Sequence, residues 1–235
     1  MKFSQQLHQK IKPVWERCYE HPFLRELADG SLPLDKFQFY LLQDNQYLDA
    51  FDELHQFLAQ KMPTTAMAES LMAALNPESS ELENRESVAE MVGVTDEAIK
   101  RTPLAPTATA YINHMYYQSY FVSPEAGVAS LLPCYWSYAE CFKRMDEPIH
   151  QATAAYQAFI DQYADPLFQQ SSEILISLVD QLADQTDEKT KKQMQTAFDL
   201  SSDYELMYWK MCYDREQWPH QQFPAIVNIN KGIVE

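Results

Sequence analysis

The sequence predicts an all-α fold, and three observations lead to this prediction. Only four of the 235 residues are glycine, whereas globular proteins average about 7%. β-Hairpins and phosphate-binding loops need residues at positive φ, which glycine supplies most readily. Prolines also divide the chain into segments in which apolar residues recur every three or four positions. We therefore expect a single-domain helical bundle over residues 1–235, with residues 217–235 as a C-terminal tail.

Proline, glycine and capping residues set the expected ends of the helices. Pro22 begins a short helix that Gly30 closes from the left-handed region, and Thr95 caps a short helical turn. A first helix carries the apolar stripe of Phe3, Leu7, Ile11 and Val14. The remaining helices are expected from Pro33 to about Met62, over 65–75, over 79–92 with Gly93 as the cap, around 111–118, from Ser123-Pro124 through Met145, from Pro148 to about Tyr163, from Asp165-Pro166 to about Asp184, and from Asp187 through Glu216.

Charge and cysteine usage exclude several classes of function. The net charge of −16 makes nucleic acid and anionic membranes poor partners. No run of about 18 apolar residues predicts a transmembrane helix, and the N-terminus lacks the apolar segment of a signal peptide. The four cysteines are scattered and form no CxxC pair, so we expect thiols in the cytoplasm and no zinc site.

The segment LLPCYWSYAEC (131–141) contains the strongest candidate nucleophile. Cys134, Tyr138 and Cys141 are spaced by four and three residues and share one helix face. Pro133 either kinks this helix or begins it. If it begins the helix, Cys134 lies in the first turn, where the positive helix end favours a thiolate. The alternative is a buried, inert cysteine beside core aromatic residues.

Two carboxylates occur among aromatic residues at helical spacing. Asp44 shares a face with Tyr47, Leu48 and Phe51, and it needs donors from a ligand or from a neighbouring tyrosine or tryptophan. Glu205 shares a face with Tyr208, Trp209 and Cys212. Burial would raise the pKa of Glu205 toward neutrality and suit it to proton transfer, and the alternative is an exposed glutamate on a mixed face.

The abundance of tyrosine suggests a pocket for a flat ring. Several of the 14 tyrosines lie in TAYINHMYYQSYF (109–121) and FIDQYADPLF (159–168). If they converge, they form an aromatic slot with hydroxyl edges; otherwise they form an aromatic core. No metal is expected, because Glu53 and His55 lack the Glu-x-x-His spacing of a di-iron bundle and no second pair appears. No nucleophile elbow is present either, so the sequence gives no signal for a Ser-His-Asp arrangement.

Five segments resemble those of the TenA family, also called thiaminase II, in their order and spacing. They are QDNQYL (43–48), ATAYINH (108–114), LLPCYWSY (131–138), IDQY (160–163) and DYELMYW (203–209). The resemblance covers roughly residues 3–217 and is weakest over 64–100. It implies a haem-oxygenase-like fold without haem, and commonly a homotetramer. The implied activity is hydrolysis of thiamin, or of 4-amino-5-aminomethyl-2-methylpyrimidine, to release the hydroxymethyl pyrimidine (HMP) for thiamin salvage.

The resemblance also implies roles for individual residues. Cys134 matches the nucleophile, Glu205 the acid/base, and Asp44 the carboxylate that binds the aminopyrimidine. The aromatic and hydroxyl lining matches Tyr47, Tyr111, Tyr138 and Tyr163. Asn45 departs from the family, which usually has an aromatic residue at this position. A thiolate that adds to the pyrimidine ring would expel the amine or thiazole without metal or cofactor.

Two other functions remain open at the level of sequence. One is a haem-oxygenase-like oxidase that depends on iron or a redox cofactor. The other is a non-catalytic, pyrimidine-binding regulatory protein, which would keep the aromatic slot but lack a reactive thiol.

Overall fold

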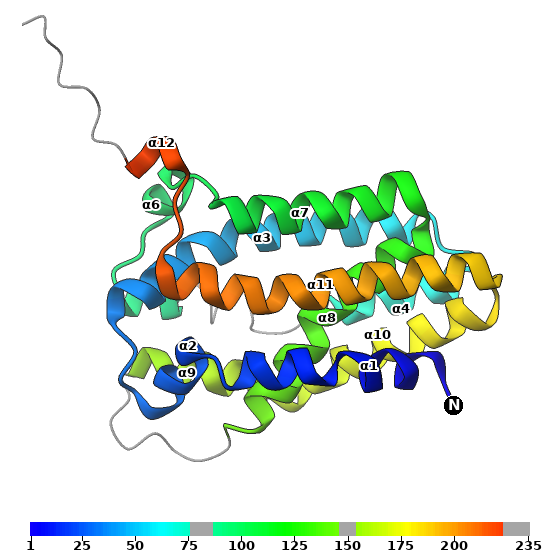
Figure 1. Ribbon diagram of the computed structural model, residues 1–235, viewed down its shortest axis with the longest axis horizontal. Coiled ribbons are helices and arrows are strands. Elements are labelled where there is room, and N and C mark those ends of the chain that lie inside the picture. Colours follow the sequence, from blue (N-terminus) through cyan, green and yellow to red (C-terminus); the bar gives the residue numbers. More distant parts are fainter. Residues whose placement is uncertain (76–86, 146–153, 223–235) are drawn as a thin grey trace, which may run out of the picture.

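Helices build the part of the chain described by the computed structural model, which comprises residues 1–75, 87–145 and 154–222 (Figure 1). No strand occurs in these ranges, so the all-α prediction is confirmed. The elements are α1 (Phe3–Tyr19), α2 (Pro22–Asp29), α3 (Leu34–Ala59), α4 (Thr65–Ala74), α6 (Asp96–Arg101), α7 (Pro106–Tyr117), the π-helix η1 (Gln118–Val122), α8 (Pro124–Lys143), α9 (Ala154–Ala164), α10 (Pro166–Asp184), α11 (Glu188–Asp214) and α12 (Pro219–Gln222).

Most helix ends lie where the capping residues predict them. The side chains of Thr95, Ser123 and Asp187 each accept a hydrogen bond from a backbone N–H in the first turn of α6, α8 and α11. Gly30 ends α2 in the left-handed conformation, at φ 81°. Local capping interactions are therefore present at these boundaries, as the sequence predicts.

Two predicted helices are only partly testable. Of the helix expected over 79–92, residues 79–86 lie outside the described part, while 87–91 are helical and Gly93 follows at φ 73°. The start expected at Pro148 also lies outside the described part, where α9 is described from Ala154 onward.

The π-helix η1 is the element that sequence periodicity did not predict. It continues directly from α7, and the amide of Ser123 donates to the carbonyl of Gln118 across five residues at 3.2 Å. π-Helical turns are rare, and they replace the i→i+4 hydrogen bonds of the α-helix for one turn. Here η1 packs against α8, where Gly127 provides the space for close approach.

α11 is the central helix of the bundle. It packs most extensively against α8, and also against α1, α7, α2 and α3. In Figure 1, α3 and α7 lie above α11, and α1 lies below it. The largest fully buried side chains include Trp209 of α11, Tyr40 of α3 and Tyr111 of α7. The core around α11 is therefore rich in aromatic rings that carry polar groups.

The C-terminal tail begins as a packed segment. Arg215 ends α11 in the left-handed conformation, and Glu216 accepts a hydrogen bond from the backbone of Thr107 at 2.9 Å. The indole N–H of Trp218 donates to the carbonyl of Leu104 at 2.8 Å. These contacts fix the end of α11 and the first tail residues against the first turn of α7 and the segment before it. Residues 223–235 lie outside the described part.

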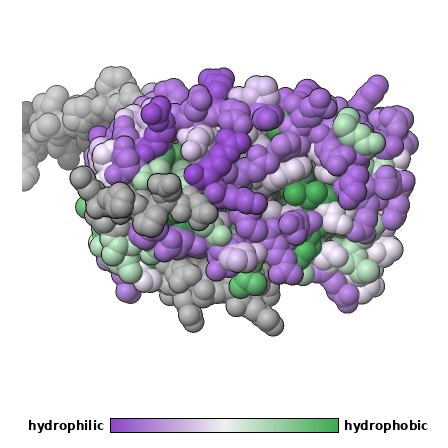
Figure 2. Space-filling view, turned by 90° about the horizontal axis from the view of Figure 1, so that it is seen from below, coloured by the Kyte–Doolittle hydropathy of each residue, from purple (hydrophilic) through white to green (hydrophobic). Residues whose placement is uncertain are grey.

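The surface view in Figure 2 is mainly hydrophilic, with hydrophobic residues scattered over it. This agrees with a chain of net charge −16. Among the described residues, none of the helices combines the length and apolar character needed to cross a membrane.

Candidate active site

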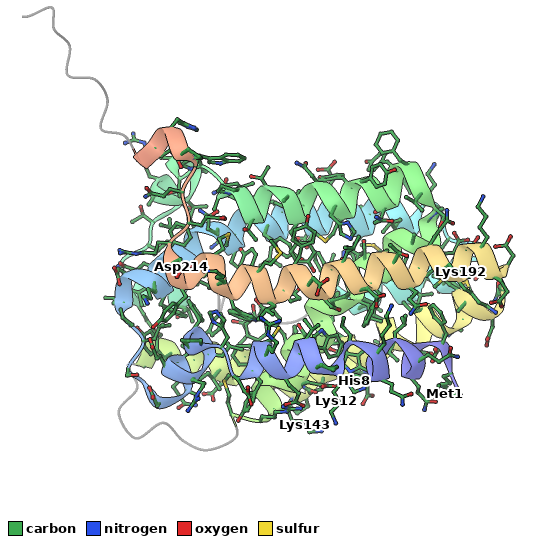
Figure 3. All side chains as sticks on the ribbon, viewed as in Figure 1. Met1, His8, Lys12, Lys143, Lys192 and Asp214 are labelled. Carbon is green, nitrogen blue, oxygen red and sulfur yellow. The ribbon has the colours of Figure 1, made fainter. Side chains whose placement is uncertain are left out.

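The seven residues singled out from the sequence come from five helices. They are Asp44 and Tyr47 of α3, Tyr111 of α7, Cys134 and Tyr138 of α8, Tyr163 of α9 and Glu205 of α11. All are buried except Cys134, which is partly exposed. In Figure 3, Lys192 and Asp214 mark the two ends of α11, and side chains fill the space between this helix and its neighbours. The structure brings Tyr111 into contact with both Glu205 and Tyr47, and Tyr138 into contact with Tyr163.

Cys134 lies within α8 and not at its start. The helix begins at Pro124, and Pro133 is an interior residue. The first-turn alternative is therefore wrong, because Ser123 and Pro124 already cap and begin the helix ten residues earlier. Activation of Cys134 by the positive end of α8 is excluded at this distance, since that effect fades within the first turn.

Cys134 nevertheless differs from the other cysteines of the chain. Cys18, Cys141 and Cys212 are buried, and Cys134 is the one partly exposed thiol among the four. Burial raises the pKa of Cys141 to about 12 and that of Cys212 well above its ordinary value. These three thiols are held protonated inside the core. Cys134 is partly buried and packs against the core, and its reactivity stays a prediction.

Glu205 is a buried carboxyl group whose side chain is held by a tyrosine. Only 2% of the residue is exposed, so the alternative of an exposed glutamate is wrong. Burial raises the pKa of Glu205 to about 8, opposed by a hydrogen bond from Tyr111 and assisted by the nearby Asp44. The Tyr111 hydroxyl donates to Oε1 of Glu205 at 2.7 Å. Glu205 therefore retains its proton to a higher pH than an exposed glutamate does.

Asp44 is a second buried carboxyl group, close enough to Glu205 to contribute to its raised pKa. It is buried, and its charge contributes to the raised pKa of Tyr138 and Tyr208, for both of which burial is the largest cause. The Tyr138 hydroxyl is 3.2 Å from that of Tyr40, one helical turn before Asp44. Cys134 also contributes to the raised pKa of Tyr138. The thiol and both carboxyl groups therefore act electrostatically on the same tyrosine.

Aromatic contacts join the tyrosines of the site into one frame. The ring of Tyr138 is 5.0 Å from that of Tyr163, measured between centroids, and 5.1 Å from that of Trp209. The rings of Tyr47 and Tyr111 are 5.3 Å apart. Such contacts fix ring orientation, so the hydroxyl groups are preorganised. Tyr208, which contacts both Tyr40 and Tyr47, and Trp209, which contacts Tyr40, connect these pairs into one aromatic cluster.

Comparison with known proteins places this arrangement in a family. The model of the TENA/THI-4/PQQC family matches residues 8–215, which is most of the chain. The chain belongs to this family. Two relatives are named aminopyrimidine aminohydrolase. The one from Bacillus subtilis is 33% identical over 223 residues, covering 93% of this chain and 92% of the relative. The one from Halalkalibacterium halodurans is 30% identical, covering 93% and 98%.

Solved structures agree with the family assignment. A TenA homologue from P. horikoshii OT3 has a TM-score of 0.79 at 26% identity, covering 91% of this chain and 99% of that structure. A TenA homologue from Pyrococcus furiosus has a TM-score of 0.80 at 23% identity, covering 90% and 100%. The predicted TenA-type, haem-oxygenase-like fold is thereby confirmed.

Two tyrosines of the site were not included in the sequence prediction. Tyr40 is fully buried, and its ring stacks on Trp209 with centroids 5.7 Å apart. Tyr208 is one turn from Glu205, and its ring centroid is 5.7 Å from that of Tyr47. The spacing of three residues from Glu205 was a sufficient signal for Tyr208. Tyr40 had a similar signal, since it precedes Asp44 by one turn.

Asn45, the departure from the TenA pattern, bonds to its own helix. Its side-chain amide donates to the carbonyl of Leu41 at 2.8 Å, and the residue is half-buried. The polar side chain therefore has a local acceptor.

Metal coordination finds no support in the described ranges. No three His, Cys, Asp or Glu side chains are grouped there as a metal site would require. His55 is buried between the carbonyl of Phe51 at 2.8 Å and the hydroxyl of Tyr135 at 3.1 Å. Burial lowers the pKa of His55 to about 4. Glu53 is engaged separately by Tyr116. These two residues therefore have structural partners.

Proposed function

We propose that this TenA-family chain is an aminopyrimidine aminohydrolase that releases HMP from 4-amino-5-aminomethyl-2-methylpyrimidine or from thiamin. The observation that carries the proposal is that a partly exposed cysteine, Cys134, and the buried carboxyl of Glu205 both act electrostatically on the hydroxyl groups of Tyr111 and Tyr138. Nucleophilic catalysis needs such a thiol beside a group that moves protons. The names of the relatives support the same activity.

Substrate binding in this proposal uses Asp44 and the tyrosine rings. The amidine edge of the aminopyrimidine presents N–H groups to the Asp44 carboxylate, and charge-assisted hydrogen bonds of this kind are short and strong. The rings of Tyr47, Tyr111, Tyr138 and Tyr163 enclose the heterocycle. Binding in this orientation places the substituent at position 5 between Cys134 and Glu205.

The proposed chemistry conserves atoms and charge with these two groups alone. The Cys134 thiolate adds to the ring carbon next to the substituted one, which breaks the aromaticity. The ring nitrogens then push electrons to expel the leaving group, and Glu205 gives its proton to the departing amine. Water adds to the exocyclic methylene and loses a proton to Glu205, and the thiolate leaves. The net reaction exchanges an amine for a hydroxyl group.

The test is an assay of thiamin and the aminomethyl pyrimidine side by side with the purified chain. We expect HMP to be released, and we expect Cys134→Ala to abolish turnover while HMP still binds. Cys141→Ala is the matched control, because it removes a buried thiol from the same helix, two turns away, and should retain activity. A fully active Cys134→Ala enzyme would exclude covalent catalysis by this residue.

The two alternative functions predict different results. A metal-dependent oxidase would carry iron or a cofactor after purification, which metal analysis and absorption spectra detect. A regulatory protein would bind HMP without turnover and would react slowly with iodoacetamide at Cys134. The proposed hydrolase should instead be labelled at Cys134, and HMP should block the labelling.

We further propose that the chain is a cytoplasmic homo-oligomer, with a tetramer as the expected form. Three exposed aromatic residues at the end of α7 and in η1 support association. They are Tyr117, Tyr120 and Phe121, which are 56%, 47% and 78% exposed. Exposed apolar surface of this kind often marks protein–protein contacts. The four reduced cysteines suit a reducing compartment.

A further inference from the structure

Tyr208 has a buried hydroxyl group without a hydrogen-bond partner in the part of the chain that the structure describes. Only 3% of the residue is exposed. Three other hydroxyl groups of the site have partners: that of Tyr111 bonds to Glu205, that of Tyr40 to Tyr138, and that of Tyr47 to the sulfur of Met115. Buried hydroxyl groups are normally satisfied, so the exception requires a reason.

The ring of Tyr208 is fixed between two tyrosines of α3. Its centroid is 5.7 Å from that of Tyr47 and 6.2 Å from that of Tyr40, and both contacts are edge-on. A side chain held on two sides cannot easily turn to find another acceptor. The unpaired hydroxyl is therefore a fixed feature of the site.

Packing against α3 places the ring of Tyr208 beside Asp44. Tyr40 and Tyr47, which both contact the Tyr208 ring, lie four residues before and three residues after Asp44 on this helix, so all three share one face. Asp44 also contributes to the raised pKa of Tyr208, for which burial and then Cys212 are larger causes. The proposed function places the amidine edge on this side of the site.

Resting on the proposed function, we propose that the Tyr208 hydroxyl hydrogen-bonds the amidine edge of the aminopyrimidine and shares that edge with Asp44. A phenol hydroxyl can donate one hydrogen bond and accept another. The amidine edge presents a ring nitrogen that accepts beside an amino group that donates, so Tyr208 can either donate to the nitrogen or accept from the amino group. No described residue satisfies this hydroxyl, and the bound ligand supplies the missing partner. Tyr208 is then a substrate-binding residue that also favours aminopyrimidines over rings without a polar edge.

Tyr208→Phe tests the proposal, because it removes one oxygen and keeps the ring. We expect the Kd for HMP and the KM for the aminomethyl pyrimidine to rise roughly tenfold, the effect of one lost hydrogen bond to a ligand. We expect kcat to stay within about threefold. The melting temperature of the ligand-free protein should be unchanged or higher, since an unsatisfied buried group is removed.

Tyr156→Phe is the matched control. Its buried hydroxyl donates to the carbonyl of Leu32 at 2.7 Å and takes no part in the polar cluster of the site. Removal of that hydroxyl should lower the melting temperature and leave the Kd for HMP unchanged. Tyr208→Phe is therefore expected to keep or raise the melting temperature and to weaken HMP binding. Tyr156→Phe is expected to lower the melting temperature and to leave HMP binding unchanged.

Three results would overturn the inference. The first is an unchanged Kd for HMP in Tyr208→Phe. The second is a fall in kcat at unchanged Kd, which would place the hydroxyl at the leaving group. The third is a loss of stability in Tyr208→Phe like that expected for Tyr156→Phe. Failure of the proposed function itself looks different, because the wild-type chain would then neither bind HMP nor turn over the substrates.

Discussion

At the scale of single residues, Glu205 shows how burial produces an acid at neutral pH. Its side chain is almost fully enclosed, and the Tyr111 hydroxyl holds one of its oxygens at 2.7 Å. The hydrogen bond alone would lower the pKa, yet burial dominates and raises it to about 8. A carboxyl group with such a pKa gives up and recovers a proton near physiological pH, which is the requirement for general acid–base catalysis.

Glu205→Gln should lower the rate of turnover by at least about 100-fold, because the amide cannot transfer the proton.

Glu205→Gln should also change the pH dependence of stability. Above its ordinary pKa of 4.5, Glu205 loses its proton in the unfolded chain but retains it in the folded protein up to about pH 8. The folded state therefore binds more protons in this window, so this group makes the wild-type protein less stable as the pH rises.

The variant lacks this titration. Its free energy of unfolding relative to wild type should increase between pH 4.5 and 8, by roughly 4 kcal/mol in total. Urea denaturation of both proteins at pH 5, 6.5 and 8 measures the difference, in which contributions from other groups largely cancel. If the free energies of unfolding of wild type and Glu205→Gln changed with pH in parallel, the raised pKa of Glu205 would be contradicted. An unchanged rate of turnover in Glu205→Gln would show that Glu205 takes no part in catalysis.

At the scale of elements, the close contact between α8 and η1 depends on a glycine, Gly127, at the point where the two helices meet. A Cβ atom at Gly127 would lie 2.7 Å from Leu58, 2.8 Å from Oγ of Ser119 and 2.9 Å from Cα of Ser119. The last contact is with backbone, which cannot move aside as a flexible side chain does. Gly127 therefore sets the distance between the π-helix and the helix that carries Cys134.

Gly127→Ala should lower the free energy of unfolding by about 1–3 kcal/mol, as overpacking of a close contact does. Thermal or urea denaturation measures the loss. Gly93→Asn is a suitable control, because Gly93 has open space around its Cα but a φ of 73°, which asparagine tolerates. A Gly127→Ala protein as stable as wild type would show that the contact relaxes at no cost.

α8 also shows where sequence reasoning reaches its limit. The Ser123-Pro124 start was predictable, because the capping hydroxyl and the proline at the first turn act locally. The position of Pro133 was not, since a proline within a helix is tolerated only when packing compensates for the lost hydrogen bond. η1 was missed for a similar reason, because its five-residue bonds leave no clear periodic signal.

At the scale of the whole molecule, the all-α class followed from composition, whereas the site depends on contacts between distant segments. Helical spacing placed Asp44 and Glu205 on aromatic faces, and the TenA resemblance assigned their roles. Spacing could not show that Tyr111 would bond to Glu205, or that the hydroxyl of Tyr208 would have no partner among the described residues, because both facts arise from packing of α3, α7 and α11. The catalytic roles of Cys134 and Glu205 stay predictions.

The exposed aromatic residues near η1 lead to a prediction about assembly. Tyr117 and Phe121 stack with centroids 5.8 Å apart, and Tyr120 stacks on Phe57 at 3.9 Å, so these rings form a preorganised surface. Phe121, at 78% exposed, is the most accessible of the three and contributes little to the core of the chain. We therefore expect Phe121→Asp to dissociate the homo-oligomer without unfolding it, because a carboxylate in an apolar interface loses its hydration.

Light scattering after size-exclusion chromatography measures the mass of each variant, and circular dichroism verifies the fold. Leu167→Asp is the matched control, since Leu167 is 51% exposed in the first turn of α10, on a different element. It should leave the mass unchanged. A wild-type chain that elutes as a monomer, or a Phe121→Asp chain of unaltered mass, would show that this surface does not hold subunits together.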